Sequence, residues 1–277
     1  MIYLNCEVKS GLGEDTFWTW FEREFPGVSF EVPSKLEDED ILLRYSTLGF
    51  LPIEGKQMAL CWELYPEMEA LFNTDCFADR MKSVLNTARY ATYRTVATKE
   101  TKKNYSQFGQ VEVIPIGVNT DLYRPLDNKL GLREKYNLPK DKKIGIWIGT
   151  RHPMKGFSKV LEFLAKNPEM EMIVVWKWQM EELKVKNVHN FVKISQEKIN
   201  ELLNAADFFL ATNQLKPYYM AEWEAMSANV PFVHYGNAER EFYPSENPRE
   251  DVMRMGWDRK SVKQKWADFF KRKGVKW

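Results

Sequence analysis

The sequence is poor in the side chains that build metal sites and disulfide frameworks. Its 277 residues include three cysteines and three histidines, namely Cys6, Cys61, Cys76, His152, His189 and His234. The cysteines are odd in number and contain no close pair, and the histidines lie in separate segments without metal-ligand spacing. We therefore expect reduced, mostly buried thiols and no dedicated metal site.

Long apolar runs are missing as well. No stretch approaches the roughly 20 apolar residues that a membrane-spanning helix needs. Residues 1–20 lack a basic start followed by an apolar segment, so no secretory signal is visible. With 44% hydrophobic and 14% aromatic residues, the chain still has enough apolar side chains for substantial cores. These features predict a folded, cytoplasmic protein.

A strong net charge is also lacking, because 40 Lys and Arg side chains are balanced by 39 Asp and Glu side chains. This balance argues against a general attraction to nucleic acid. The exception is a basic tail, residues 259–276, in which Asp268 is the single acid. Its eight basic residues are Arg259, Lys260, Lys263, Lys265, Lys271, Arg272, Lys273 and Lys276. The tail predicts either a solvated helix face or peripheral contact with an anionic surface.

The first part of the chain reads as alternating strands and helices. An apolar start at Ile2–Cys6 is broken by Gly11 and Gly13 and followed by aromatic residues at helical spacing from Phe17. Further strand candidates are Val28–Val32, Ile41–Leu43, Gln57–Cys61 and Thr95–Ala97, with a helix around Met81, Val84, Leu85 and Ala88. The alternation predicts a mainly parallel sheet.

A second series of the same kind begins at Ile144. Its strand candidates are Ile144–Ile148, Met172–Val175, Phe191–Ile194, Phe208–Ala211 and Phe232–His234, with helices from Phe157, around Ile199 and near Glu222–Met226. Pro125–Lys143, rich in charge, Pro and Gly, is typical of a linker. At the end of the chain, Val262, Trp266, Phe269 and Phe270 share one helical face, which predicts a docked helix. Two Rossmann-like domains are the natural interpretation.

One loop has the composition of a phosphate site. Gly149 follows a strand, and Lys155 precedes Gly156 and a helix, so that backbone amides and a helix N-terminus are available to an anionic diphosphate. Lys155 supplies a point charge where negative charge grows on a leaving phosphate, and Arg151 adds a bidentate donor. The alternative is an ordinary strand-to-helix loop with solvated charges. Trp176 and Trp178, near a strand end, are candidates to line a ligand cleft, although tryptophans more often pack in a core or between domains.

Three stretches, in order, resemble glycosyltransferase family 4, whose members have the GT-B fold. They are VIPIGVNTDLYRP at Val113–Pro125, IWIGTRHPMKG at Ile146–Gly156 and ADFFLATNQLKPYYMAEWEAMSANVPFV at Ala206–Val233. Weaker matches, CWELYPE from Cys61 and VATKETKKNYSQFG from Val96, extend the resemblance over most of residues 57–277.

The resemblance implies an α/β protein of two Rossmann-like domains facing across a cleft. An acceptor-side domain would span residues 1–122, a nucleotide-sugar-binding domain residues 123–255, and a helix at residues 256–277 would pack back on the first. The implied activity is transfer, with retention, of a sugar from a nucleoside diphosphate, a UDP-sugar being favoured, to a hydroxyl of a saccharide or lipid-linked sugar. No cofactor or metal is implied.

The resemblance also assigns residues to roles. Lys155 and Arg151 are the catalytic candidates. The donor-binding candidates are Gly149, Thr150, Lys155, Lys216, Tyr218, Tyr219 and Glu224, and the acceptor-side candidates are Gly11, Gly13, Trp62 and Glu63. Glu224 is the family's ribose-binding glutamate, a role that suits a carboxylate accepting two hydroxyl hydrogen bonds. A solvated helix residue is the alternative.

Three departures from the family pattern keep other functions open. Lys216 stands eight positions before Glu224 where the family has a second glutamate, Thr150 replaces an arginine, and Trp62 replaces a histidine. A non-catalytic nucleotide-sugar-binding protein is therefore one alternative. A dinucleotide enzyme is disfavoured because GLGED, from Gly11, lacks the G-x-G-x-x-G pattern.

A viral-type transferase acting on a hydroxymethylated DNA base is the other alternative. The short chain, the basic tail and three further lysines, Lys99, Lys102 and Lys103, favour it because cations neutralise phosphates. The acid-rich stretch at Lys35–Asp40 is evidence against it.

Overall fold

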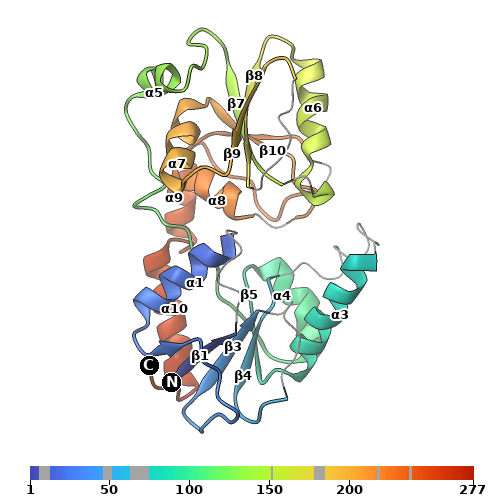
Figure 1. The fold of residues 1–277 in the computed structure, drawn as a ribbon, viewed down its shortest axis with the longest axis vertical. Coiled ribbons are helices and arrows are strands. Elements are labelled where there is room, and N and C mark those ends of the chain that lie inside the picture. Colours follow the sequence, from blue (N-terminus) through green and yellow to red (C-terminus); the bar gives the residue numbers. More distant parts are fainter. Residues whose placement is uncertain are drawn as a thin grey trace. The chain divides into compact units, whose positions relative to one another are not determined.

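The computed structural model describes residues 1–5, 13–45, 52–62, 75–150, 152–177, 185–216, 219–236 and 239–277, with the backbone alone at 13–16 and 75–80. The chain divides into two compact units (Figure 1). Unit 1 comprises Met1–Gly117 together with Lys260–Trp277, and unit 2 is the continuous segment Val118–Arg259.

Unit 1 is built on a six-stranded sheet of order β2-β1-β3-β4-β5-β6, in which every described pair is parallel. The strands are β1 Ile2–Asn5, β2 Val28–Ser29, β3 Ile41–Tyr45, β4 Gln57–Leu60, β5 Tyr93–Val96 and β6 Val111–Val113. The helices are α1 Gly13–Glu24, α3 Asp75–Tyr90, α4 Lys99–Tyr105, the short η2 Ser106–Phe108 and α10 Arg259–Arg272. Helices α1 and α10 lie on one side of this sheet, with α3 and α4 on the other (Figure 1).

Aromatic side chains join α10 to unit 1. Trp266 and Phe270 are fully buried, and their rings contact Phe21 of α1 and Phe25, which directly follows α1, at centroid distances of 5.4 and 5.7 Å. The expected apolar stripe of the last helix is therefore confirmed, and its burial removes large aromatic surfaces from water.

Within the part of the chain that the structure describes, no helix has the length and apolar character needed to cross a membrane.

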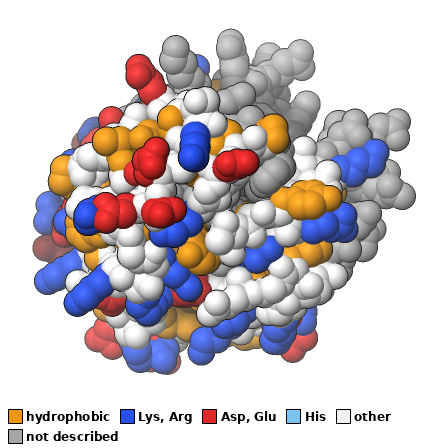
Figure 2. Space-filling model, turned by 90° about the horizontal axis from the view of Figure 1, so that it is seen from below, with side chains coloured by type: hydrophobic (Ala, Val, Ile, Leu, Met, Phe, Trp, Pro, Cys, Tyr) orange, Lys and Arg blue, Asp and Glu red, His pale blue; other side chains and the backbone are white. Residues whose placement is uncertain are grey.

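Four of the eight basic residues of the tail pair with acids of unit 1. Lys263 pairs with Glu24 at 3.0 Å and Lys276 with Glu39 at 2.6 Å, while Arg272 and Lys273 both reach Glu112. The hydrogen bond from Lys263 is the largest influence on Glu24, and the net effect lowers the pKa of that carboxyl. On the face drawn in Figure 2, basic and acidic side chains are interspersed. Part of the positive charge of the tail therefore forms ion pairs within unit 1.

Unit 2 has a five-stranded parallel sheet of order β11-β10-β7-β8-β9. The strands are β7 Ile144–Gly149, β8 Glu171–Trp176, β9 Val188–Val192, β10 Phe208–Ala211 and β11 Phe232–His234. The helices are α5 Lys129–Lys135, η3 Pro153–Lys155, α6 Phe157–Lys166, α7 Gln196–Ala205, α8 Met220–Ser227 and α9 Pro248–Arg254. The strand order reverses between β7 and β10, and such a switch point is where parallel sheets bind ligands.

The expectation of a linker at Pro125–Lys143 is wrong. Helix α5 lies within this segment, and its Arg133 is buried. The Arg133 guanidinium forms an ion pair with Asp207 at 2.7 Å and donates to the carbonyl of Ala205 at 2.9 Å. Charge that resembled a solvated linker is therefore part of the packing of unit 2.

Two other expectations need correction. Strand β9 ends at Val192, whereas the sequence pattern placed it at Phe191–Ile194. Trp176 does not line a cleft, because it is 1% exposed and its ring packs 4.5 Å from that of Phe157. Its indole N–H donates to Asn190, which satisfies the polar atom in the core. Trp178 lies outside the described residues.

Replacing Trp266 by alanine should destabilise unit 1 by about 3–5 kcal/mol, the usual cost of truncating a buried tryptophan. The loss should appear as a lower urea midpoint. Lys271→Ala, an exposed substitution on the same helix, serves as control and should shift stability by less than about 0.5 kcal/mol. Equal effects of the two substitutions would contradict the packing described for α10.

Candidate functional site

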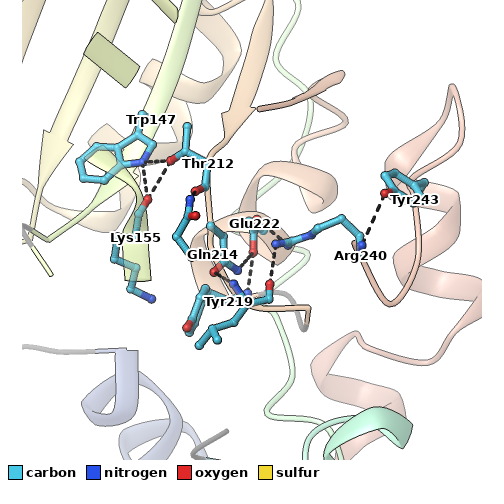
Figure 3. Close-up of polar contacts among 10 residues, drawn as sticks. Trp147, Lys155, Thr212, Gln214, Tyr219, Glu222, Arg240 and Tyr243 are labelled. Atoms are coloured by element: carbon cyan, nitrogen blue, oxygen red, sulfur yellow. Dashed lines mark hydrogen bonds and ion pairs between the residues drawn. The ribbon is translucent and has the colours of Figure 1, made fainter. Parts of the chain in front are cut away.

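The segments that follow β7 and β10 are bonded to each other at the switch point. The hydroxyl of Thr212 donates to the carbonyl oxygen of Lys155 at 2.8 Å, and the amide of Gln214 donates to that of Met154 at 3.0 Å. The indole N–H of Trp147 lies 2.9 Å from the Thr212 hydroxyl oxygen and 3.2 Å from the Lys155 carbonyl oxygen. The backbone of Lys155 is thereby fixed against the end of β10 (Figure 3).

Gly156 is required by this arrangement. Its backbone has φ +68°, in the left-handed region, where it ends η3 and begins α6. A Cβ at this position would also collide with the carbonyl oxygen of Thr212. Gly149 is constrained differently, because a Cβ there would lie 2.6 Å from the Trp147 ring. Both glycines of the loop allow close packing that a side chain would prevent.

The Lys155 ammonium lies over the ring of Tyr219, 3.0 Å from its centroid. Figure 3 shows the lysine side chain extending from η3 toward the tyrosine. The Tyr219 hydroxyl lies 3.2 Å from the sulfur of Met154, so the aromatic ring contacts both neighbouring residues of η3. Two residues assigned separately from the sequence are therefore in direct contact.

A buried ion pair supports the start of α8. Glu222, 3% exposed, accepts from the Arg240 guanidinium at 2.7 Å, from the Tyr219 amide at 2.8 Å and from the Asn213 side chain at 3.2 Å. Arg240 also donates to the carbonyl of Leu215 at 2.9 Å. The sequence analysis missed this pair. A glutamate three residues after an N-cap position is the signal that would have pointed to Glu222.

Glu224, two residues further along α8 and therefore on a different face of the helix, is buried differently. It is 3% exposed, and its Oε2 atom has no hydrogen-bond partner among the described residues. Burial is the largest cause that holds the pKa of Tyr123 well above its ordinary value, followed by the negative charge of Glu224 and by hydrogen bonding to the same carboxyl group. A buried carboxylate oxygen without a partner is costly, and such costs are characteristic of functional sites.

Other sequence-assigned residues have varied positions. Thr150 directly follows β7, and Lys216 is half-exposed with its ammonium 3.8 Å from Glu239. Gly13 is the first residue of α1. Trp62 packs in the aromatic cluster of unit 1, 4.8 Å from the ring of Phe17. Outside the described residues are Arg151, Tyr218, Gly11 and Glu63.

The described residues contain no group of three or more His, Cys, Asp or Glu side chains placed to hold a metal ion. Positive charge near the switch point comes instead from Lys155 and from the N-terminus of α6, whose first amides have no partner within the helix. This combination suits an anion with several oxygens.

Residues 128–238 match the sequence family described as "Glycosyl transferases group 1". The matched segment includes both switch-point segments, Glu222 and Glu224. No curated protein sequence matches the chain.

Solved glycosyltransferase structures share the fold of the chain. Sucrose-phosphate synthase from Thermosynechococcus elongatus matches 84% of this chain and 73% of its own, at 14% identity and a TM-score of 0.70. The structure of Anabaena HepE, solved with UDP-glucose, matches 98% of this chain and 99% of its own chain, at 13% identity and a TM-score of 0.69. WaaG, a glycosyltransferase involved in lipopolysaccharide biosynthesis, matches 97% of this chain and 80% of its own chain, at 16% identity and a TM-score of 0.57. The GT-B fold expected from the sequence is thus confirmed.

Replacing Arg240 by methionine should destabilise unit 2 by about 3–5 kcal/mol, because Glu222 would keep a buried, unpaired charge. The double variant Glu222→Gln/Arg240→Met should lose less stability than Arg240→Met alone, because neither buried charge remains. Urea unfolding measures both.

Arg254→Met is the matched control. Arg254 forms an ion pair with Asp251, but its side chain is 69% exposed, and exposed ion pairs contribute about 1 kcal/mol or less to stability. A double variant as unstable as the sum of its single variants would contradict the coupling of Glu222 and Arg240.

Proposed function

We propose that the chain is a retaining glycosyltransferase that uses a UDP-sugar as donor and a hydroxyl of a saccharide or lipid-linked sugar as acceptor. The observation that carries the proposal is the placement of Lys155 and Glu224 after the adjacent strands β7 and β10, within the segment that matches the glycosyl transferases group 1 family. One supplies a cation and the other an acceptor of hydroxyl hydrogen bonds.

The diphosphate would bind at the segment after β7. There Gly156 brings the backbone close, and α6 begins directly after it. Helix N-termini attract anions through their unpaired amides and their dipole. Lys155 adds a full positive charge whose backbone is held by Thr212. These features support binding of a leaving diphosphate.

The ribose would bind at Glu224. Its Oε2 atom has no described partner, and a carboxylate can accept hydrogen bonds from two neighbouring hydroxyls. Uridine is the proposed nucleoside because the HepE structure, which shares the fold over 98% of this chain, contains UDP-glucose. A saccharide acceptor is favoured over DNA because Glu24, Glu39 and Glu112 already pair with cations of the basic tail.

In the proposed reaction the bond between the anomeric carbon and the diphosphate oxygen breaks as the acceptor oxygen bonds to the same face of the sugar. Negative charge grows on the departing UDP, and the acceptor proton passes to a donor phosphate oxygen. Lys155 and Arg151 stabilise that charge electrostatically, the kind of term that often contributes most to catalysis. With cationic side chains in this role, a divalent metal is dispensable.

UDP should bind the chain and raise its melting temperature, because a ligand that binds only the folded state stabilises it by mass action. ADP and GDP should stabilise less. Glu224→Ala should weaken UDP binding about tenfold through loss of the ribose contacts, measured by titration calorimetry. If no nucleoside diphosphate stabilises the folded protein, the glycosyltransferase proposal fails.

Lys155→Ala should reduce turnover of a UDP-sugar at least about 100-fold, on the scale of losing one electrostatic donor, while leaving the fold intact. Hydrolysis of the donor gives a readout that needs no known acceptor. Lys166→Ala, at the far end of α6, is the matched control and should retain wild-type turnover.

Excess EDTA should leave the wild-type rate unchanged. UDP binding without turnover on any sugar donor or acceptor would instead favour a non-catalytic binding protein, and equal rates for the two lysine variants would overturn the assignment of Lys155.

A further inference from the structure

We propose that Tyr219 is a positioning residue that holds the ammonium of Lys155 in place for the departing diphosphate. The sequence assigned Tyr219 to the donor itself. The inference rests on the proposed function, because it concerns how the catalytic candidate Lys155 is held. It arises from two segments, after β7 and after β10, that only the fold brings together.

The contact is close and has two parts. The Lys155 ammonium is 3.0 Å from the centroid of the Tyr219 ring, and the Tyr219 hydroxyl is 3.2 Å from the Met154 sulfur. A cation over the face of an aromatic ring is attracted by the ring's negative charge density, and the attraction grows when the site is desolvated. The ring therefore binds the side chain of Lys155 and packs against its neighbour.

Tyr219 is itself held firmly. It is the N-cap residue of α8, and its amide donates to Glu222 at 2.8 Å. Glu222 is fixed in turn by Arg240 and Asn213. The buried ion pair of Glu222 and Arg240 thus orients the backbone from which the tyrosine ring projects. In this proposal the pair positions Tyr219 as well as stabilising unit 2.

The lysine is fixed at both ends as a result. Its carbonyl oxygen accepts from Thr212, and its ammonium lies on the Tyr219 ring. A lysine side chain has a flexible four-carbon stem, and ordering it at the moment of reaction would cost entropy. A cation that is already positioned stabilises developing charge without that reorganisation. Tyr219 would therefore affect the chemical step more than donor affinity.

Three variants test this assignment by donor hydrolysis and by UDP titration. Tyr219→Leu should lower kcat about tenfold and change the Kd for UDP by less than about twofold, because the ring that holds the cation is lost. Tyr219→Phe keeps the ring, so its kcat and its Kd for UDP should both stay within about twofold of the wild-type values. Tyr90→Leu, the same substitution at a 59% exposed tyrosine of unit 1, is the matched control.

A double-mutant cycle shows whether Tyr219 acts through Lys155. In a Lys155→Ala background, Tyr219→Leu should cause no further loss of kcat, since there is no ammonium left to hold. A further tenfold loss in that background, or a rise in the Kd for UDP shared by the Phe and Leu variants, would overturn the proposal and assign Tyr219 to the donor.

A readout without turnover separates this inference from the proposed function. Reaction of Lys155 with an amine-directed reagent, followed by peptide mass mapping, should be several-fold faster in Tyr219→Leu than in wild type and unchanged in Tyr219→Phe. If no sugar donor is bound or turned over but this pattern is observed, the proposed function fails and the lysine contact stands. Equal modification rates in all three proteins would refute the positioning role, whatever the activity.

Discussion

The candidate site depends on the hydrogen bonds between η3 and the end of β10. Through the carbonyl oxygens of Met154 and Lys155, the segment after β7 is bonded to Thr212 and Gln214. Parallel strands bring their carboxyl ends to one edge, but they do not by themselves bring the following loops into contact. Because these bonds do so, a catalytic candidate from one strand and an aromatic ring from the other lie in contact. Gly156 permits the approach, since a side chain there would collide with Thr212.

Helix α8 shows how differently two buried carboxylates on the same element are treated. Glu222 accepts from three groups, including the buried guanidinium of Arg240. Glu224, one helical face away, has an oxygen without a described partner. A satisfied buried charge gives a defined local structure, whereas an unsatisfied one lowers stability unless a ligand completes it. The first fits a structural role and the second a binding role.

Periodicity predicted the parts of the fold in which apolar residues repeat regularly. The buried face of α10 and the strands Phe208–Ala211 and Phe232–His234 were found at the expected residues because their patterns are set by local burial. The Pro125–Lys143 segment was misjudged, since nothing local shows that Arg133 pairs with a residue of another element, Asp207. Likewise, Lys155 and Glu224 were recognised by motif, but the pairings of Lys155 with Tyr219 and of Glu222 with Arg240 are tertiary contacts without a fixed sequence spacing.

The return of α10 to unit 1 has a consequence for biosynthesis. Unit 2 is continuous in sequence, so all of its residues have been translated before α10 emerges from the ribosome. Unit 1 must wait for Trp266 and Phe270, and until they arrive the aromatic face of α1 that they cover is exposed to water. During synthesis the later half of the chain can therefore finish folding first, and the nascent N-terminal half is the one exposed to aggregation or in need of a chaperone.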